Sequence, residues 1–143
     1  MKISILLPYK ENYSPDYAGA VSIFINAVSK LSRYRNNIRI FGNTNLKDKF
    51  SKNYVNIPLE KRYFKSLTKI YLNNFLKIEN KRKSDIIEVH NRPKYLESLK
   101  HLKNRKFVLY FHNDPLSVSN LDLTVVTPNL YTSLTIFAEK LFI

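Results

Sequence analysis

The stretch DIIEVHNRPKYLESLKHLKNRKFVLYFHNDP (residues 85–115) decides the fold. It contains two short apolar runs, DIIEVH (85–90) and KFVLYFH (106–112), which predict buried strands. Between them, PKYLESLKHLKN (93–104) predicts a helix that carries Pro93 in its first turn, a favoured place for proline. Strand, helix and strand in this order indicate two parallel strands joined by a crossover helix.

The same alternation extends toward the N-terminus. KISILLPY (2–9), NIRIFGN (37–43) and YVNIPL (54–59) predict three further strands. Residues at helical spacing predict a helix from Ala20 to Leu31, with an apolar face made of Ala20, Phe24, Ala27, Val28 and Leu31. Residues 61–83 predict another helix, with an apolar face made of Phe64, Leu67, Tyr71, Phe75 and Ile78. We therefore expect a single α/β domain, a Rossmann-like doubly wound parallel sheet.

Composition narrows the class of protein. The 143 residues suit one domain, and a hydrophobic content of 44% favours a folded core. The absence of cysteine excludes a disulfide framework and thiolate metal sites, and no His, Asp or Glu spacing matches a metal site. No apolar run reaches 18 residues, and MKISILLPYKEN (1–12) lacks the features of a signal peptide. We expect a cytoplasmic protein that needs no metal or other cofactor.

Polar residues follow the strands where ligands bind in doubly wound folds. His90-Asn91 and His112-Asn113 each end a predicted strand, and the 11–19 loop follows the first strand. Ligands of such sheets bind outside the carboxyl ends of the strands, so these segments should converge on one crevice. Imidazole would serve as a hydrogen-bond partner for phosphate or sugar, or as an acid or base near neutral pH.

Each of these segments also has a purely structural interpretation. Asn, Asp and Pro are common turn formers, so HNRP (90–93) and HNDP (112–115) also fit ordinary turns after strands. Gly19 suits either a close approach of phosphate to a helix start or a simple helix entry. The nucleotide-binding G-x-G-x-x-G and the P-loop lysine motif are both missing.

The net charge of +13 is concentrated in the middle of the chain. Residues 60–106 hold fourteen Lys and Arg against five acidic residues, while residues 107–143 hold one against three. A basic region of this kind attracts nucleic acid, anionic lipid or phosphorylated substrates. A chain rich in Lys, Asn, Ile and Tyr is also what AT-rich coding DNA produces, so composition is the competing explanation of the charge.

Three segments together resemble the N-terminal domain of family 4 glycosyltransferases of the GT-B fold. They are MKISILLPYKENYSPDYAGAVSIFINAVSKL (1–31), DIIEVHNRPKYLESL (85–99) and FVLYFHNDP (107–115). The resemblance covers residues 1–117. It implies a retaining, metal-independent transfer of a sugar from a nucleotide-sugar to a glycan or lipid-linked acceptor, as in the synthesis of lipopolysaccharide and other envelope polysaccharides.

The resemblance also assigns roles to residues. It makes His112 the catalytic-site histidine that contacts the transferred sugar, and it makes Gly19 and Ala20 the loop near the donor phosphates and sugar. Ala20 stands where many members have a second glycine. The candidates for the acceptor side are Asp16, Tyr17, His90, Asn91, Arg92, Asn113 and Asp114. The basic segment 61–83 would dock peripherally on the inner face of the cell membrane, on anionic lipid.

Residues 118–143 depart from the family pattern. LTVVTP (123–128) predicts a strand, and Leu134, Phe137, Ala138 and Leu141 predict one face of a helix. This strand–helix tail either belongs to the same domain or follows a frameshift. The family's donor-binding residues lie in a second domain, so we expect this chain to be inactive alone unless a second chain supplies that domain.

Two other classes of function compete with sugar transfer. One is a non-catalytic basic module for nucleic acid or an anionic membrane surface, with Tyr63, Phe64, Tyr71 and Phe75 as stacking residues between lysines. We expect nucleic acid not to be the partner, because aromatic residues at helical spacing more often belong to a core. The other is a different Rossmann-like protein, such as an epimerase or a sugar-phosphate binder.

Overall fold

The structure, a computed structural model, describes residues 1–60, 66–112 and 134–138, the last group through its backbone alone. The elements follow in the order β1 (Ile3–Leu6), α1 (Ala20–Leu31), β2 (Ile38–Gly42), β3 (Tyr54–Asn56), α2 (Leu67–Arg82), β4 (Ile86–His90), α3 (Tyr95–Leu99), β5 (Lys106–Phe111) and β6 (Leu134–Ala138). The five strands and three helices predicted before residue 113 are all present, with ends that differ by a few residues. Residues 61–65, the first five of the predicted helix 61–83, lie outside the described part.

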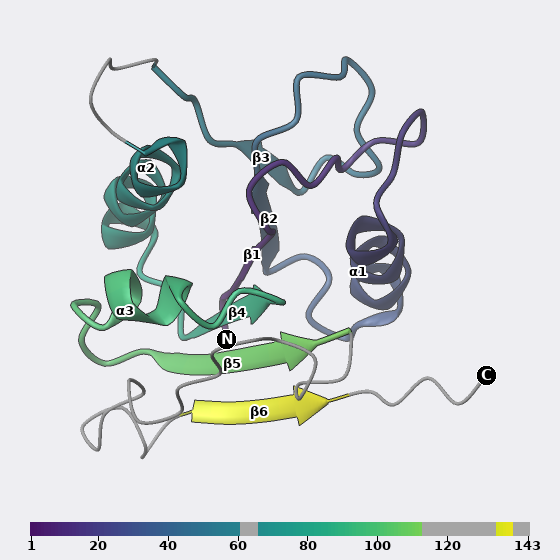
Figure 1. Cartoon of the computed structure of the whole chain (residues 1–143). Helices are drawn as coiled ribbons and strands as arrows, with labels where there is room; N and C mark the ends of the chain where they lie inside the picture. The colour runs from purple at the N-terminus through teal and green to yellow at the C-terminus, as the bar shows by residue number, and fades with distance from the viewer. Residues whose placement is uncertain (61–65, 113–133, 139–143) are drawn as a thin grey trace.

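The strands form one parallel sheet in the order β3-β2-β1-β4-β5-β6 (Figure 1). This is the order of a Rossmann fold. The direction of winding reverses between β1 and β4, which are neighbours in the sheet with Ile3 opposite Ile86. The sheet therefore has its switch point between β1 and β4, where folds of this type bind ligands at the carboxyl edge.

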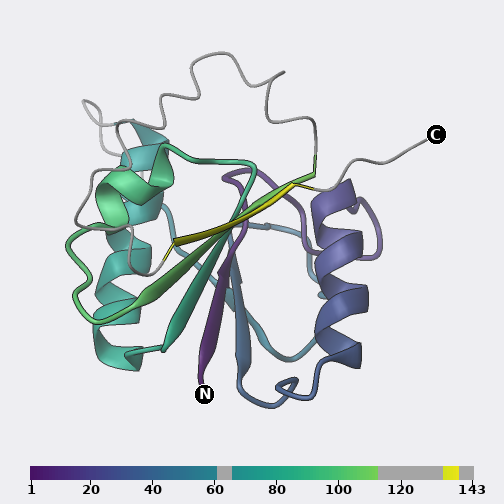
Figure 2. The same cartoon turned by 90° about the horizontal axis from the view of Figure 1, so that it is seen from below.

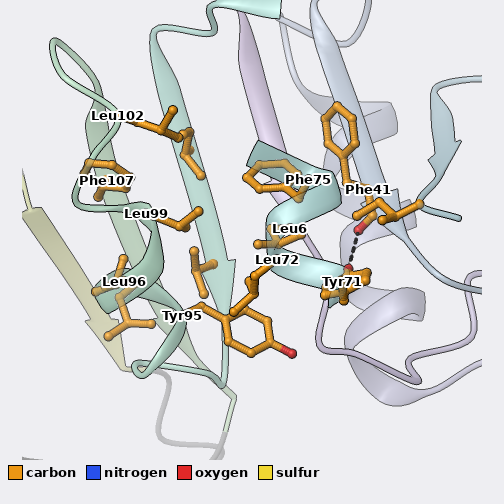
Figure 3. Packing of buried hydrophobic residues seen from close by; sticks show 14 of the residues in the cluster. Leu6, Phe41, Tyr71, Leu72, Phe75, Tyr95, Leu96, Leu99, Leu102 and Phe107 are labelled. Carbon is orange, nitrogen blue, oxygen red and sulfur yellow. Dashed lines mark hydrogen bonds between the residues drawn. The ribbon is translucent and has the colours of Figure 1, made fainter. Parts of the chain in front are cut away.

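Helices cover both faces of the sheet, which confirms the doubly wound arrangement. Figure 2 shows α1 on one face and α2 with α3 on the other. Side chains of a strand alternate between faces, so each face has its own core. The α2–α3 face buries Leu6, Phe41, Ile87, Val89, Leu109 and Phe111 from the strands against Tyr71, Leu72, Phe75, Tyr95, Leu96 and Leu99 from the helices (Figure 3). The α1 face buries Ile5, Leu7, Ile38 and Ile40 against Tyr13, Val21 and Ile25.

Tyr71 ties α2 to the carboxyl end of the sheet. Its buried hydroxyl donates to the carbonyl oxygen of Leu7 at 2.9 Å and lies 3.3 Å from that of Phe41 (the dashed line in Figure 3 marks the contact with Phe41). Burial raises the pKa of this hydroxyl well above its ordinary value. Tyr71 and Phe75 are fully buried, so neither offers a surface on which a base could stack.

The opposite edge of the sheet is held by the buried carboxylate of Glu79. It accepts from the Ser4 hydroxyl at 2.6 Å and from the backbone N–H of Ser84 at 2.7 Å, and the Ser84 hydroxyl also contacts it. Arg82 adds hydrogen bonds to Ser4 and to two backbone carbonyls. This network joins the end of α2 to β1 and to Asn37, just before β2, so it belongs to the scaffold rather than to the ligand edge.

The prediction for the buried face of α1 was wrong. The buried residues are Val21, Ser22, Ile25 and Ser29, whereas Leu31 is 88% exposed and Val28 is also exposed. The buried face is rotated from the predicted one by roughly one residue, about 100° of helix. Small serines let α1 approach Tyr13 and the loop after β1 closely, and a pattern based on apolar residues alone does not detect that.

The predicted helix in the tail was also wrong where the structure describes it. Residues Leu134–Ala138 form β6, a strand that pairs with β5 in parallel register from Phe107–Leu134 to Phe111–Ala138. The sequence LTIFA contains β-branched and aromatic residues, and β5 offers it a line of backbone hydrogen bonds. β6 therefore belongs to the same sheet, and the predicted strand at 123–128 lies outside the described residues.

Two further observations complete the fold. α3 is shorter than predicted, because the chain turns after Leu99 and reaches a left-handed residue, Asn104, with φ of 59°. None of the helices in the described ranges is long and apolar enough to cross a bilayer.

Candidate functional site at the carboxyl edge of β4 and β5

Three side chains form a hydrogen-bonded row at the ends of β4 and β5. His90 lies in the middle: its Nε2 is 2.5 Å from Oε1 of Glu88, and its Nδ1 is 2.8 Å from Nε2 of His112. The two imidazole rings stack with centroids 5.0 Å apart. His90 is completely buried, while His112 is half-buried. A carboxylate is thus linked to a half-buried imidazole through a buried one.

The strand geometry explains why these residues meet. Glu88 and His90 are two positions apart on β4, so both point to the α1 face. His90 pairs with Tyr110 across the parallel ladder, which brings His112, two residues further, to the same face. The prediction that the two histidine-bearing strand ends converge is therefore confirmed for His90 and His112.

Asn91 joins the two strand ends through its backbone and its side chain. Its N–H donates to the carbonyl oxygen of Tyr110 at 2.9 Å, and its Oδ1 accepts from the N–H of His112 at 2.8 Å. Asn91 has a φ of 51°, in the left-handed region that asparagine tolerates better than most residues. This contact holds His112 in place after β5 has ended.

Aromatic side chains enclose the pair of histidines. Phe24 of α1 packs edge-on against His112 with ring centroids 4.9 Å apart, and it also contacts Tyr110 at 5.2 Å. Tyr110 lies against both imidazoles, at 5.4 Å from His90 and 4.8 Å from His112. Behind them, Glu88 and Phe24 line a small, mostly apolar cavity of about 110 Å³ between α1 and the sheet. Within the row, His90 is therefore fully enclosed, whereas the side chain of Glu88 is still 25% exposed.

The start of α1 lies on the same edge, and its N-terminus is capped by Glu11. The Glu11 carboxylate accepts from the N–H of Ser22 at 3.0 Å and sits against Gly19, where an added Cβ would be 2.0 Å from Oε1. Free N–H groups at a helix start attract anions. A carboxylate of the chain itself thus occupies the start of α1, beside Gly19.

The remaining candidates lie around this edge. Asp16 and Ala20 are exposed, and Tyr17 is 74% exposed. Arg92 is exposed, and one of its guanidinium N–H groups donates to the carbonyl oxygen of Asn91 at 2.9 Å. Burial raises the pKa of the nearby Tyr95 hydroxyl, although Arg92 and the N–H of Tyr9 act against this increase. Asn113 and Asp114 lie outside the described residues.

Sequence reasoning missed Glu88 and Phe24. A signal for Glu88 was present, because a glutamate in the middle of IIEVH lies two residues before His90 and so shares its face by strand alternation. Nothing local indicated that Phe24 would reach His112.

The row of Glu88, His90 and His112 is linear, and both nitrogens of His90 are already engaged. The described residues contain no group of three His, Asp or Glu side chains suited to hold a metal ion.

No model of a known protein family matches this chain, and no curated protein matches it either.

Proposed function

We propose that this chain is the acceptor-side domain of a retaining GT-B glycosyltransferase of the family 4 type. Its substrates would be a nucleotide-sugar and a glycan or lipid-linked acceptor of the cell envelope. The observation that carries the proposal is the pair His90–His112 at the switch-point edge of a Rossmann-ordered sheet, beside the glycine at the start of α1. The resemblance expects His112 to contact the transferred sugar, His90 to lie on the acceptor side and Gly19 to lie near the donor.

The position of each residue at this edge suggests the part of the substrates that it would bind. His112, half-buried and held by Asn91, would form a hydrogen bond with a hydroxyl of the transferred sugar. The start of α1 at Gly19 and Ala20 would face the donor phosphates once Glu11 has moved away. Exposed Asp16, Tyr17 and Arg92 would serve the acceptor, since they border the same edge. His90 is completely buried, so it would act indirectly, through its hydrogen bond to His112.

Sugar transfer would also require a donor-side domain. Stabilisation of the developing charge on the leaving diphosphate is commonly a large part of catalysis. The resemblance assigns those groups to a second Rossmann-like domain, which lies outside these 143 residues. We therefore expect the isolated chain to bind a nucleotide-sugar only weakly at this edge, through its sugar and phosphates, and not to transfer the sugar.

An NMR titration tests this function. Isotope-labelled chain would be titrated with UDP-hexoses and GDP-hexoses, with free nucleotides, and with a short DNA duplex as a control. We expect a nucleotide-sugar to shift the amide signals of Gly19, Asn91 and His112, while the exposed His101, at the far end of α3, stays unchanged. Shifts caused by DNA alone, with a steep salt dependence, would instead support a nucleic-acid module. Detectable sugar transfer by the purified chain would contradict the need for a second domain.

The location that fits this function is the cytoplasmic face of the cell membrane. Exposed Lys69, Lys77 and Lys81 lie at helical spacing along α2, and Lys94 and Lys100 flank α3 on the same side of the sheet. Lysines near an anionic leaflet each contribute about 1 kcal/mol of attraction. We propose that this surface, the α2 lysine face, docks on anionic lipid, so that lipid-linked acceptors are nearby.

A further inference from the structure

Two loops leave the carboxyl edge of the sheet side by side at the switch point, one after β1 and one after β4. The two strands pair in parallel with Leu6 opposite Val89, so the residues that follow them lie at the same edge. Tyr95 of α3 ties the loops together, because its hydroxyl accepts from the N–H of Tyr9 at 2.8 Å and its N–H donates to the carbonyl oxygen of Arg92 at 3.0 Å. A ligand on the α3 side of the switch point would therefore meet residues of both loops.

Lys10, in the first of these loops, has a backbone conformation that lysine seldom adopts. The N–H of Glu11 donates to the carbonyl oxygen of Pro8 at 3.0 Å, which closes a four-residue turn. Lys10 is the third residue of this turn and has a φ of 73°, whereas Tyr9 before it has a negative φ. A turn of this type favours glycine or asparagine at the third position. Strained residues cluster at ligand sites, so the side chain of Lys10 is a candidate for a role in binding.

Positive charge without a neutralising carboxylate lies beside the contact between Tyr9 and Tyr95. The ammonium group of Lys10 is 5.8 Å from the centroid of the Tyr9 ring, and the exposed guanidinium of Arg92 uses one N–H on the carbonyl oxygen of Asn91. Burial raises the pKa of the Tyr95 hydroxyl, and the nearby guanidinium of Arg92 acts against this increase. Within residues 1–60 and 66–112, neither Lys10 nor Arg92 forms an ion pair.

We propose that Lys10, Arg92 and the hydroxyl of Tyr95 form a binding site for a phosphate or diphosphate group, and that this group belongs to the acceptor. Arginine binds phosphate through a fork of N–H groups, and lysine binds it as a point charge. Tyr95 is only 4% exposed, and its hydroxyl proton has no acceptor in the part of the chain that the structure describes. That proton is therefore available to an anion beside Arg92.

The side of the sheet on which this site lies favours the acceptor over the donor. Tyr9 and Tyr95 pack with the core of the α2–α3 face, whereas His112 packs against Phe24 of α1 on the other face. A lipid-linked acceptor in which a diphosphate joins the glycan to the lipid could hold that group here while the donor sugar lies at His112. The assignment to the acceptor rests on the function proposed above, whereas the anion site itself does not.

Titration of the full chain with inorganic pyrophosphate, followed by calorimetry and by ¹H–¹⁵N spectra, tests the anion site. We expect the amide signals of Tyr9, Lys10 and Arg92 to shift. Lys10→Asn and Arg92→Gln should each weaken binding about tenfold, the usual order for one charge-assisted hydrogen bond. The matched controls Lys52→Asn and Arg35→Gln remove the same charges from exposed positions before β3 and β2, at the opposite edge of the sheet, and should bind nearly as wild type does.

Lys10→Asn also separates a role in binding from a role in the fold. Asparagine tolerates the left-handed position of the turn better than lysine, so this variant should unfold at the same urea concentration as wild type or a higher one, although it binds pyrophosphate more weakly. Unchanged affinity in Lys10→Asn or Arg92→Gln would overturn the site. Equal losses in the two controls would do so too, because the net charge of +13 would then attract the anion without a defined site.

Two further ligands show which substrate carries the phosphate group. We expect geranyl diphosphate, a short prenyl diphosphate, to displace pyrophosphate at a lower concentration than UDP does. Equal or better displacement by UDP would overturn the assignment to the acceptor.

The same variants distinguish this proposal from the proposed function. If pyrophosphate binding depends on Lys10 and Arg92 while nucleotide-sugars leave the signals of Gly19 and His112 unchanged, the anion site stands and the sugar-transfer function fails. If nucleotide-sugars shift Gly19 and His112 but all four variants bind pyrophosphate equally, the function stands and the anion site fails.

Discussion

The backbone and the side chain of Asn91 contribute separately to the stability of the fold. Its φ of 51° favours glycine or asparagine, and its Oδ1 holds the N–H of His112. Asn91→Gly keeps the backbone freedom and loses the hydrogen bond, whereas Asn91→Ala loses both. We expect Asn91→Ala to lower the free energy of unfolding by about 1 kcal/mol more than Asn91→Gly. Urea unfolding of the two variants measures this, and equal stabilities would contradict it.

Tyr71 gives the protein a predictable response to alkaline pH. Burial raises its pKa, and it also raises the pKa of Tyr54 to about 12, so the folded state keeps protons that the unfolded chain releases near pH 10. This contribution to stability is complete below about pH 10 and is lost as the pH rises from there toward the folded pKa values. The free energy of unfolding should therefore decrease steeply above about pH 10.

Tyr71→Phe measures how much this one hydroxyl contributes to the free energy of unfolding. At pH 7 it should cost about 1 kcal/mol, because the buried carbonyl of Leu7 loses its donor. The difference from wild type should shrink above about pH 10, since phenylalanine has no proton to release. Denaturant unfolding at several pH values follows both effects. Tyr17→Phe, at a site that is 74% exposed, is the control and should behave like wild type.

At the scale of elements, the start of α1 depends on a carboxylate from the preceding loop. Gly19 has ordinary backbone angles, with φ of −77°, so Gly19→Ala should act mainly by displacing Glu11 from the cap. We expect a loss of about 1 kcal/mol for Gly19→Ala and a similar loss for Glu11→Ala. In the double variant the two losses should not add, because both remove the same contact. Additive losses would show that Glu11 does not cap α1.

Some strands and helices could be predicted from the sequence and others could not. Short apolar runs predicted β1, β4 and β5, because buried parallel strands need little besides apolar residues. The buried face of α1 was not predictable in this way, since it includes Ser22 and Ser29, whose burial depends on how closely the loop approaches. β6 was mistaken for a helix because its five residues fit either pattern until the edge of β5 is known.

The candidate site was predictable in part for a similar reason. Alternation along parallel strands brought His90 and His112 together and could also have included Glu88. The capping of α1 by Glu11 and the contact of Phe24 with His112 depend on the path of a loop and the rotation of a helix. Neither of these leaves a periodic pattern in the sequence.

At the scale of the molecule, the charge of +13 should make lipid binding selective and sensitive to salt. We expect vesicles rich in phosphatidylserine to bind the chain and neutral vesicles not to bind it. Replacing Lys69, Lys77 and Lys81 with glutamine should weaken binding about 100-fold, at about 1 kcal/mol for each lysine. Replacing the exposed Lys30, Lys47 and Lys52, which lie outside α2, removes equal charge and should weaken binding much less. Similar losses in both triple variants would rule out docking by the α2 lysine face.

The position of β1 between β2 and β4 also has a consequence for the folding of the protein during translation. Its partner on β4 follows 83 residues later, from Ile3 to Ile86. At a synthesis rate of about 5–20 residues per second, β1 waits roughly 4 to 17 seconds before that partner exists. During this time one edge of an apolar strand is open to any other nascent chain. Of the strand pairings described, β1–β4 joins the strands farthest apart in the sequence, so we expect β1 to benefit most from a chaperone during translation.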